Sequence, residues 1–317
     1  MTPIVTLTLN PTVDYATSAQ QVVPDVKLRC TEPQIDPGGG GINVSRAILM
    51  LDGQSTALIS IGGATGARLL ELLALEGVPT VAFQGPGETR LSFSVTEGES
   101  GRQYRFVTPG PVWGEADVDR ALATVDRATH PGAYIVLSGS QPPGVAKDFP
   151  KILADHVEDH RAKLIVDTSG PALRNLVEEP HRPLHVLRTD DVEAEEVAGR
   201  PLPAASDTAR FAAELVGRGV ADAVIFARGA EGSVLATAQG AWLARPAPVE
   251  EVSKVGAGDS FVGAFTLALA RGESMDQALR YGVAASAAAV GTEATRLCPK
   301  PDVDRLLPAC SIEELAA

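Results

Sequence analysis

Cationic side chains are scarce in this sequence relative to anionic ones. Its 317 residues hold 27 Lys and Arg against 40 Asp and Glu, which gives a formal net charge of −13. Nucleic acids and membrane surfaces are themselves anionic, so we expect the chain to bind neither. A phosphorylated small molecule would also be repelled by the protein as a whole. A site for such a molecule therefore requires a local cluster of Lys and Arg.

Cysteine and aromatic residues are scarce as well. Cys30, Cys298 and Cys310 are scattered and odd in number, without zinc-site spacing or a disulfide framework. That usage fits a reducing compartment, and we expect a cytoplasmic protein. The first ten residues resemble a strand rather than a signal peptide, and no run is long and apolar enough to span a bilayer. Aromatic residues make up 4% of the chain, so aliphatic side chains are expected to fill the core.

Short β-rich apolar runs alternate with helical segments over most of the chain. The alternation predicts βαβ units, and hence an α/β fold with a mostly parallel sheet between helices. The length allows one large domain or two average ones. The expected strands are residues 4–9, 56–61, 134–138, 164–167, 186–187 and 223–226. The expected helices are residues 41–51, 67–75, 115–128, 149–160, 208–217, 259–270 and 275–289.

Two stretches interrupt this alternation. Residues 15–36 lack helical periodicity and carry one expected strand, 26–31. Residues 90–107 are typical of a hairpin, with strands 91–96 and 103–107 joined by a turn at Glu99, Ser100 and Gly101. Together the two stretches predict a small β lid that is discontinuous in sequence. Edge strands of this kind often pair between subunits, so we expect a homodimer that forms through the lid.

Gly256, Ala257, Gly258 and Asp259 stand directly before an apolar helical run. Small residues let a ligand approach the backbone, and a helix start presents free N–H groups and a positive dipole end. This arrangement suits a phosphoryl group in transfer, and the Asp259 carboxylate can accept the proton of an attacking hydroxyl. A glycine-rich turn with Asp259 as an ordinary helix cap explains the same residues. A Walker A motif is absent.

Four consecutive glycines occupy positions 38–41, just before Asn43. Such a run is costly in chain entropy, and a simple turn needs only one or two glycines. One interpretation is close approach of the backbone at Gly39 and Gly40 to a sugar, with Asn43 reaching its hydroxyls. The alternative is a flexible hinge.

These motifs, in this order along the chain, resemble the ribokinase-like carbohydrate kinases, also called the PfkB family. The residues that carry the resemblance are Asn10-Pro11 with Asp14, the glycine run with Asn43, Gly62-Gly63 with Gly66, and Gly256 to Asp259. Within the family, residues 27–31, 37–44, 103–107, 138–140 and 295–298 resemble the minor 6-phosphofructokinase branch. The related 1-phosphofructokinases and tagatose-6-phosphate kinases usually carry Lys where this chain has Gly40.

The resemblance implies one ribokinase-like domain over residues 1–317, with the lid at about 15–36 and 90–107. It implies ATP and Mg²⁺ as cofactors and a phosphosugar as substrate, with fructose 6-phosphate favoured. Tagatose 6-phosphate or fructose 1-phosphate is the alternative substrate. A catalytically weak sensor of sugar phosphate or nucleotide is the alternative from another functional class.

The resemblance also implies roles for individual residues. Asp259 would be the general base, with Gly256, Ala257 and Gly258 around the transferred phosphoryl group. Lys27, Arg90 and Arg105 would supply the positive charge that the net charge demands, unless they are simply solvated surface charges. Lys27 would also face the transferred phosphoryl group. The residues implied in substrate binding are Asp14, Lys27, Gly39, Gly40, Asn43, Arg90, Arg105 and Ser140.

The nucleotide side departs from the family pattern. Lys-Pro-Asn followed by Glu is usual, whereas this chain has Arg188, Thr189 and Asp190 before Glu193. Glu193 is implied near Mg²⁺, although an acidic helix start explains the same charges. Ala227-Arg228-Gly229 lacks a usual hydroxyl. Arg228 would replace it as a phosphate contact, or would simply be an exposed side chain. The residues implied in nucleotide binding are Arg188, Asp190, Glu193, Ala227, Arg228, Gly229 and Gly232.

A site for a monovalent cation is also implied by the resemblance. Its positions, where backbone carbonyls would coordinate K⁺, are Ser253, Val255, Ala289, Thr292 and Ala294.

Overall fold

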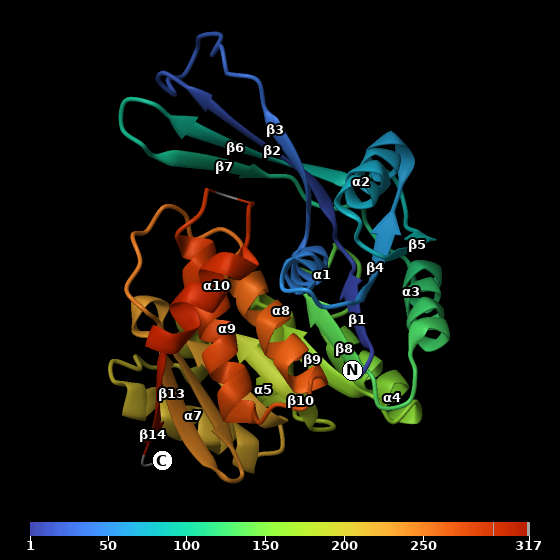
Figure 1. Cartoon of the computed structure of the whole chain (residues 1–317). Coiled ribbons are helices and arrows are strands. Elements are labelled where there is room, and N and C mark those ends of the chain that lie inside the picture. Colours follow the sequence, from blue (N-terminus) through green and yellow to red (C-terminus); the bar gives the residue numbers. More distant parts are fainter. Residues whose placement is uncertain (294, 316–317) are drawn as a thin grey trace.

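A ten-stranded sheet runs through the computed structural model, which describes residues 1–293 and 295–315 (Figure 1). Its order is β14-β13-β12-β11-β10-β9-β8-β1-β4-β5. The seven strands from β11 to β5 are parallel, and the last three pair antiparallel. The strands are β1 (Ile4–Thr8), β4 (Thr56–Ile61), β5 (Thr80–Gln84), β8 (Tyr134–Ser138), β9 (Lys163–Asp167), β10 (Leu184–Thr189), β11 (Ala221–Ala227), β12 (Ser233–Thr237), β13 (Gly240–Arg245) and β14 (Ser311–Leu315).

Helices cover both faces of this sheet, as expected for parallel strands (Figure 1). On one face lie α1 (Gly40–Met50), α8 (Ala257–Ala270) and α9 (Met275–Val290), with α10 (Lys300–Leu306) against α9. On the other lie α3 (Glu115–Ala128), α4 (Phe149–Asp159), α5 (Gly170–Glu178), α6 (Asp191–Ala198) and α7 (Ala205–Gly217). Short 3-10 turns occupy Gly229–Glu231 and Leu307–Ala309. No helix in the described ranges has the length and apolar character needed to cross a membrane.

The two-residue period of a strand divides the core between these two layers. In β11, Val224 and Phe226 pack with the α3–α7 layer, whereas Ala223 and Ile225 pack with the α8–α9 layer. This burial on both faces explains the continuous apolar runs from which the central strands were predicted. The predicted α/β fold with a mostly parallel sheet is confirmed.

A second, four-stranded sheet has the order β3-β2-β6-β7 and lies beside the main body (Figure 1). Its strands are β2 (Thr12–Ala19), β3 (Gln34–Gly38), β6 (Arg90–Glu97) and β7 (Gln103–Val107). Helix α2 (Gly63–Glu76) packs against its base through an apolar cluster that includes Val13 and Leu69. The β6–β7 hairpin was predicted from sequence and is present.

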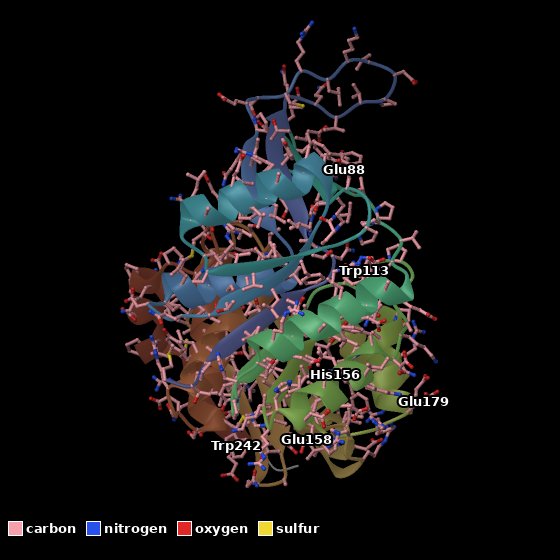
Figure 2. All side chains as sticks on the ribbon, turned by 90° about the vertical axis from the view of Figure 1, so that its right-hand side faces the viewer. Glu88, Trp113, His156, Glu158, Glu179 and Trp242 are labelled. Carbon is pink, nitrogen blue, oxygen red and sulfur yellow. The ribbon has the colours of Figure 1, made fainter. Side chains whose placement is uncertain are left out.

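The strand expected at residues 26–31 is wrong. Residues 20–33 form an extended loop that protrudes from the molecule (Figure 2). Both long edges of β2 are already occupied by β3 and β6, so this segment cannot pair with β2. Val26 is 61% exposed and has no apolar surface to pack on. β-propensity without a partner does not make a strand.

The strand β3 was not predicted, although it lies next to that segment. Its sequence contains Asp36, Pro37 and Gly38, three residue types that are depleted in strands. It forms because it pairs antiparallel with β2, which places Asp36 opposite Asp14.

The aromatic pair Phe211–Phe226 offers a test of the core beside α7. Phe226 is fully buried, and the two rings stack with centroids 5.5 Å apart. We expect Phe226→Ala to lower the free energy of unfolding by about 3–5 kcal/mol, because it leaves a cavity in a packed layer. Urea denaturation followed by circular dichroism measures this change. Leu75→Ala, at a side chain 81% exposed, is the control and should change it by less than about 0.5 kcal/mol. Equal effects of the two substitutions would contradict this account of the core.

Candidate active site

The N-terminus of α8 presents free backbone N–H groups. Gly256 caps the helix at φ 77°, and a Cβ there would lie 2.5 Å from a Leu297 methyl group, so only glycine fits. Ser260 is the first residue of the helix to donate its N–H to the helix cap, the carbonyl of Gly256. Within the described ranges, the N–H groups of Gly258 and Asp259 have no acceptor. Such a helix start attracts an anionic group.

Asp259 lies in the first turn of this helix and its side chain is held by α1. Asn43 donates its side-chain amide to Asp259 Oδ2 over 2.9 Å. Arg46 in turn donates to the Asn43 Oδ1 atom over 3.2 Å, and is itself paired with Glu76 at 2.6 Å. Because Arg46 binds the amide oxygen of Asn43, the amide nitrogen is the end that points at the Asp259 carboxylate. Two segments 216 residues apart thus meet at one carboxylate.

The pKa of Asp259 is raised to about 6. Burial of the carboxylate is the largest cause and the nearby charge of Asp167 is the second. The hydrogen bond from Asn43 and the charge of Arg188 oppose that rise without cancelling it. A carboxylate with this pKa is ionised at neutral pH yet is a better proton acceptor than an ordinary Asp, which suits a general base.

Asp167 and Ser138 belong to the site, although the sequence analysis did not identify them. Asp167 ends β9 and accepts a hydrogen bond from Arg188 over 3.0 Å, and Ser138 at the end of β8 lies 3.2 Å from its other oxygen. Arg188 is the last but one residue of β10, which pairs with β9. The carboxyl ends of parallel strands meet at one edge of a sheet, where α/β proteins bind ligands. The ends of the predicted strands were the available signal for both residues.

Arg188 presents donors beside the start of α8. A Cβ on Gly258 would lie 3.0 Å from Arg188 Nη1, so the guanidinium lies directly against the helix turn with the free N–H groups. Its Nε is buried without a hydrogen-bond partner in the described part of the chain. Burial acts to lower the pKa of Arg188, but Asp167 and the other nearby carboxylates outweigh it and the pKa is raised. A permanent positive charge therefore adjoins the anion-binding turn.

The glycine run has a steric reason at each position that touches the site. Gly39 has φ 120°, in the region that favours glycine. A Cβ on Gly40 would lie 2.5 Å from the Ser138 hydroxyl, and one on Gly41 would lie 2.6 Å from Thr8 Oγ1. The run therefore lets α1 begin directly against the ends of β1 and β8. Close packing explains the glycines, and no hinge is required.

An open pocket lies between the small sheet and the segment before α8. Asp14 and Arg105 line it from the sheet, and Val255 and Thr295 line it from the body. Asp14 Oδ1 is buried without a hydrogen-bond partner in the described structure, so it can accept a bond from a ligand hydroxyl. Burial is the largest influence on Asp14 and raises its pKa, while the charges of Arg90 and Arg105 oppose the rise. The two guanidinium groups therefore act on the same carboxylate.

Arg90, Asn10 and Ser140 form a chain next to this pocket. Arg90 Nε donates to the carbonyl of Asn10 over 3.3 Å, and Asn10 Nδ2 donates to Ser140 Oγ over the same distance. Lys27 differs from the other predicted substrate residues. It lies on the exposed loop 20–33 and makes no hydrogen bond or ion pair with any described residue. The structure brings together the remaining cations, Arg90 and Arg105, around Asp14.

Asp190 and Glu193 cap the start of α6 reciprocally. Asp190 Oδ1 accepts the N–H of Glu193 over 2.8 Å, and Glu193 Oε2 accepts the N–H of Asp190 over 3.2 Å. This is a capping box, the structural explanation that the sequence left open. Glu193 has a raised pKa, chiefly because it is partly buried. Across the described residues, no set of three or more His, Cys, Asp and Glu side chains is arranged to hold a metal ion.

Arg228 is occupied by structural contacts. All five of its N–H donors are engaged: with Glu231 twice, with the carbonyls of Leu202 and Pro203, and with the Thr208 hydroxyl. Its side chain is only 9% exposed. A phosphate contact from Arg228 would have to displace one of these bonds.

The neighbouring predicted nucleotide residues are placed by a tight turn. Ala227 ends β11, Gly229 begins the 3-10 turn that follows, and Gly232 comes directly after that turn. Gly232 has φ 108°, and a Cβ there would overlap the carbonyl oxygen of Ala244 in β13. The shape of the turn therefore depends on this glycine.

The segment before α8 meets the end of α9 at the predicted cation positions. Ser253 donates its N–H to the carbonyl of Val290 over 3.1 Å, and the Thr292 hydroxyl donates to the carbonyl of Ala289 over 2.9 Å. Hydroxyl and carbonyl oxygens are the ligands that hard cations prefer. Ala294, also predicted at this site, lies outside the described residues.

Known proteins resemble this chain over nearly its whole length. ATP-dependent 6-phosphofructokinase isozyme 2 of Mycobacterium tuberculosis is 40% identical over 302 residues, which cover 95% of this chain and 88% of that protein. The enzyme of the same name from Escherichia coli K12 is 40% identical over 306 residues, which cover 96% and 98%.

Solved structures agree with this resemblance. Phosphofructokinase-2 from E. coli in complex with potassium has a TM-score of 0.92 and 38% identity, covering 98% of this chain and 99% of that one. Its complex with fructose-6-phosphate and its tetrameric inhibited form each have a TM-score of 0.90, with the same identity and coverage. Residues 7–302 match the family model for pfkB family carbohydrate kinases. This chain belongs to the pfkB family of carbohydrate kinases.

Proposed function

We propose that this protein is an ATP-dependent 6-phosphofructokinase, which transfers the terminal phosphoryl group of ATP to the primary hydroxyl of fructose 6-phosphate. The observation that carries the proposal is the Asp259 carboxylate beside the free N–H groups at the start of α8, next to a pocket lined by Arg105 and Asp14. The relatives that are 40% identical bear this activity in their names.

Asp259 acts as the general base in this proposal. It takes the proton of the sugar hydroxyl as that oxygen attacks, while the hydrogen bond from Asn43 holds the carboxylate in place. The N–H groups of Gly258 and Asp259 stabilise the negative charge on the transferred phosphoryl group, as in an oxyanion hole. Arg188 adds a fixed positive charge at the same turn.

Arg90 and Arg105 hold the phosphate already present on the sugar, and Asp14 holds its hydroxyls through the unpaired Oδ1. Gly40 and Ser140 lie at the adjoining strand end, where the backbone comes close to the sugar. Lys27 joins the site only if the exposed loop 20–33 folds over the pocket, because nothing holds it there in this structure. Closure of that kind would also exclude water.

Mg²⁺ and ATP complete the proposed site, and bound ATP supplies the phosphoryl group. The residues fit: Arg188 has unused donors for phosphate oxygens, and Asp190 and Glu193 offer carboxylate oxygens suited to Mg²⁺ or its waters. We further propose K⁺ near Ser253 and Thr292, where oxygen ligands converge. The three free cysteines fit a reducing compartment, and we propose a cytoplasmic location on that ground.

The choice of substrate can be tested directly. A coupled ADP-release assay on fructose 6-phosphate, tagatose 6-phosphate and fructose 1-phosphate should give the highest kcat/KM with fructose 6-phosphate.

Asp259→Asn should reduce turnover by about three or more orders of magnitude without loss of fold, because it removes the proton acceptor. A thermal melt of the variant checks the fold. Near-normal turnover in Asp259→Asn would show that this residue is not the general base. A higher kcat/KM with another of the three sugars would contradict the choice of fructose 6-phosphate as the substrate.

The raised pKa of Asp259 predicts an acid limb in the pH profile. The base works when ionised, so kcat should fall below pH 6, by about tenfold at pH 5. Asp167→Asn removes a charge that raises this pKa and frees the charge of Arg188, which lowers it. Both changes lower the pKa of Asp259, so the acid limb of the pH profile should move to lower pH in this variant. Asp222→Asn removes a carboxylate that is largely exposed on the surface, and it should leave the acid limb of the profile at the same pH. A limb that stays or moves upward in Asp167→Asn would contradict this electrostatic account.

The outer face of the small sheet supports a homodimer. Tyr15 and Phe93 stack there with centroids 5.2 Å apart, and Phe106, the cross-strand partner of Phe93, is 54% exposed. An exposed aromatic sheet face of this kind suits association with a second copy. The E. coli relative has a form described as tetrameric, so a dimer is the minimal unit of this proposal.

Phe106→Arg tests the interface. A charge in the centre of an apolar contact should weaken dimerisation at least tenfold, measured by analytical ultracentrifugation over a dilution series. Leu75→Arg, at an exposed site on α2, is the matched control and should leave the dimer intact. A monomeric parent protein, or an unchanged dimer in Phe106→Arg, would overturn this interface.

A further inference from the structure

Thr295 has a backbone conformation that its side chain disfavours. Its φ is 74°, a region where β-branched residues are genuine outliers. Leu297, two residues later, has φ 53° and is buried against Gly256 at the start of α8. Strain persists only where the surroundings enforce it, and it often marks a functional contact. The loop is therefore bound tightly to the anion-binding turn while it directs Thr295 elsewhere.

The Thr295 side chain reaches the small sheet. Its hydroxyl donates to Asp36 Oδ2 over 2.7 Å. Gln34 donates its side-chain amide to the same Asp36 oxygen over 2.9 Å and to Thr295 Oγ1 over 3.3 Å. Three side chains thus form a closed network in which a charged acceptor receives two donors, the stronger kind of hydrogen bond.

This network lies at the edge of the proposed sugar pocket. Asp36 faces Asp14 across the β2–β3 pair, so both carboxylates lie on the face that lines the pocket. Thr295 lines the same pocket from the opposite side. The bond between Asp36 and Thr295 therefore joins the two sides of the pocket.

Few other hydrogen bonds join the small sheet to this side of the pocket. Within the described residues, every hydrogen bond from the strands of the small sheet to the C-terminal half of the chain involves Thr295. The sheet is also attached at its base, close to this contact, by the continuation of β3 into α1 and by apolar packing on α2. Among the described residues, Thr295 is therefore the point in the C-terminal half to which the strands of the small sheet are hydrogen-bonded.

We propose that Thr295 is a positioning residue, which pins β3 through Asp36 and thereby holds Asp14 and Arg105 over the phosphosugar. This inference rests on the proposed function for its substrate and deepens it. The hydroxyl does not touch the reacting atoms. Its loss should weaken phosphosugar binding more than it slows the chemistry.

Thr295→Val removes the hydroxyl and keeps the shape, and Thr295→Ser keeps the hydroxyl. We expect Thr295→Val to raise KM for fructose 6-phosphate about five- to tenfold, with KM for ATP changed less than twofold and Thr295→Ser close to the parent. Hydrogen exchange without ligand should be faster over residues 12–38 in Thr295→Val. Thr237→Val, which removes a distant hairpin hydroxyl, is the matched control and should change neither. Asp36→Ala should reproduce the effects of Thr295→Val and serves alone if that variant does not fold.

The double variant Thr295→Val/Asp36→Ala separates a shared contact from two independent ones. A combined effect no larger than that of the stronger single variant supports the proposal. Additive effects, an unchanged KM, or unchanged exchange over residues 12–38 would overturn it. The exchange measurement needs no substrate. If the parent protein does not turn over fructose 6-phosphate, the proposed function fails while exchange still decides whether Thr295 pins the sheet.

Discussion

A carboxylate buried next to a helix start is the interaction on which the rest of the site depends. Removing the charge of Asp259 from water is unfavourable, and its raised pKa records that cost. Asn43 and Arg188 compensate for part of it, each held in turn by another ion pair: Arg46–Glu76 behind Asn43, and Asp167 beside Arg188. The site is therefore supported by α1 on one side and by the ends of β9 and β10 on the other. Its geometry depends on the packing of both halves of the chain.

The protein concentrates positive charge locally against a strongly acidic background. Arg105 lines the pocket from the small sheet and Arg90 acts on the same carboxylate, Asp14. Arg188 lies against the start of α8, whereas Arg228 is fully used within the fold. Because Arg90, Arg105 and Arg188 are each attached to a strand, the position of each is set by the sheet rather than by a flexible side chain alone.

The small sheet has two faces with different chemistry. Alternation along β2, β6 and β7 places Asp14, Ser92 and Arg105 on the pocket side and aromatic side chains on the outer side. In the proposed function, substrate binding and subunit association would use opposite faces of the same strands. The hydrogen bonds to Thr295 tie this sheet to the loop next to α8.

Local pattern determined much of this protein. The alternation of apolar runs and helices predicted the α/β fold, and the glycines before Asp259 predicted the helix start with its carboxylate, because both depend on residues near in sequence. The wrong strand at 26–31 and the missed strand β3 show the limit, since a strand exists only where a neighbour can pair with it. Asp167, Ser138 and the contact between Asp36 and Thr295 could not be predicted. They meet only because parallel strands end at one edge and the chain folds back on itself, which local spacing does not encode.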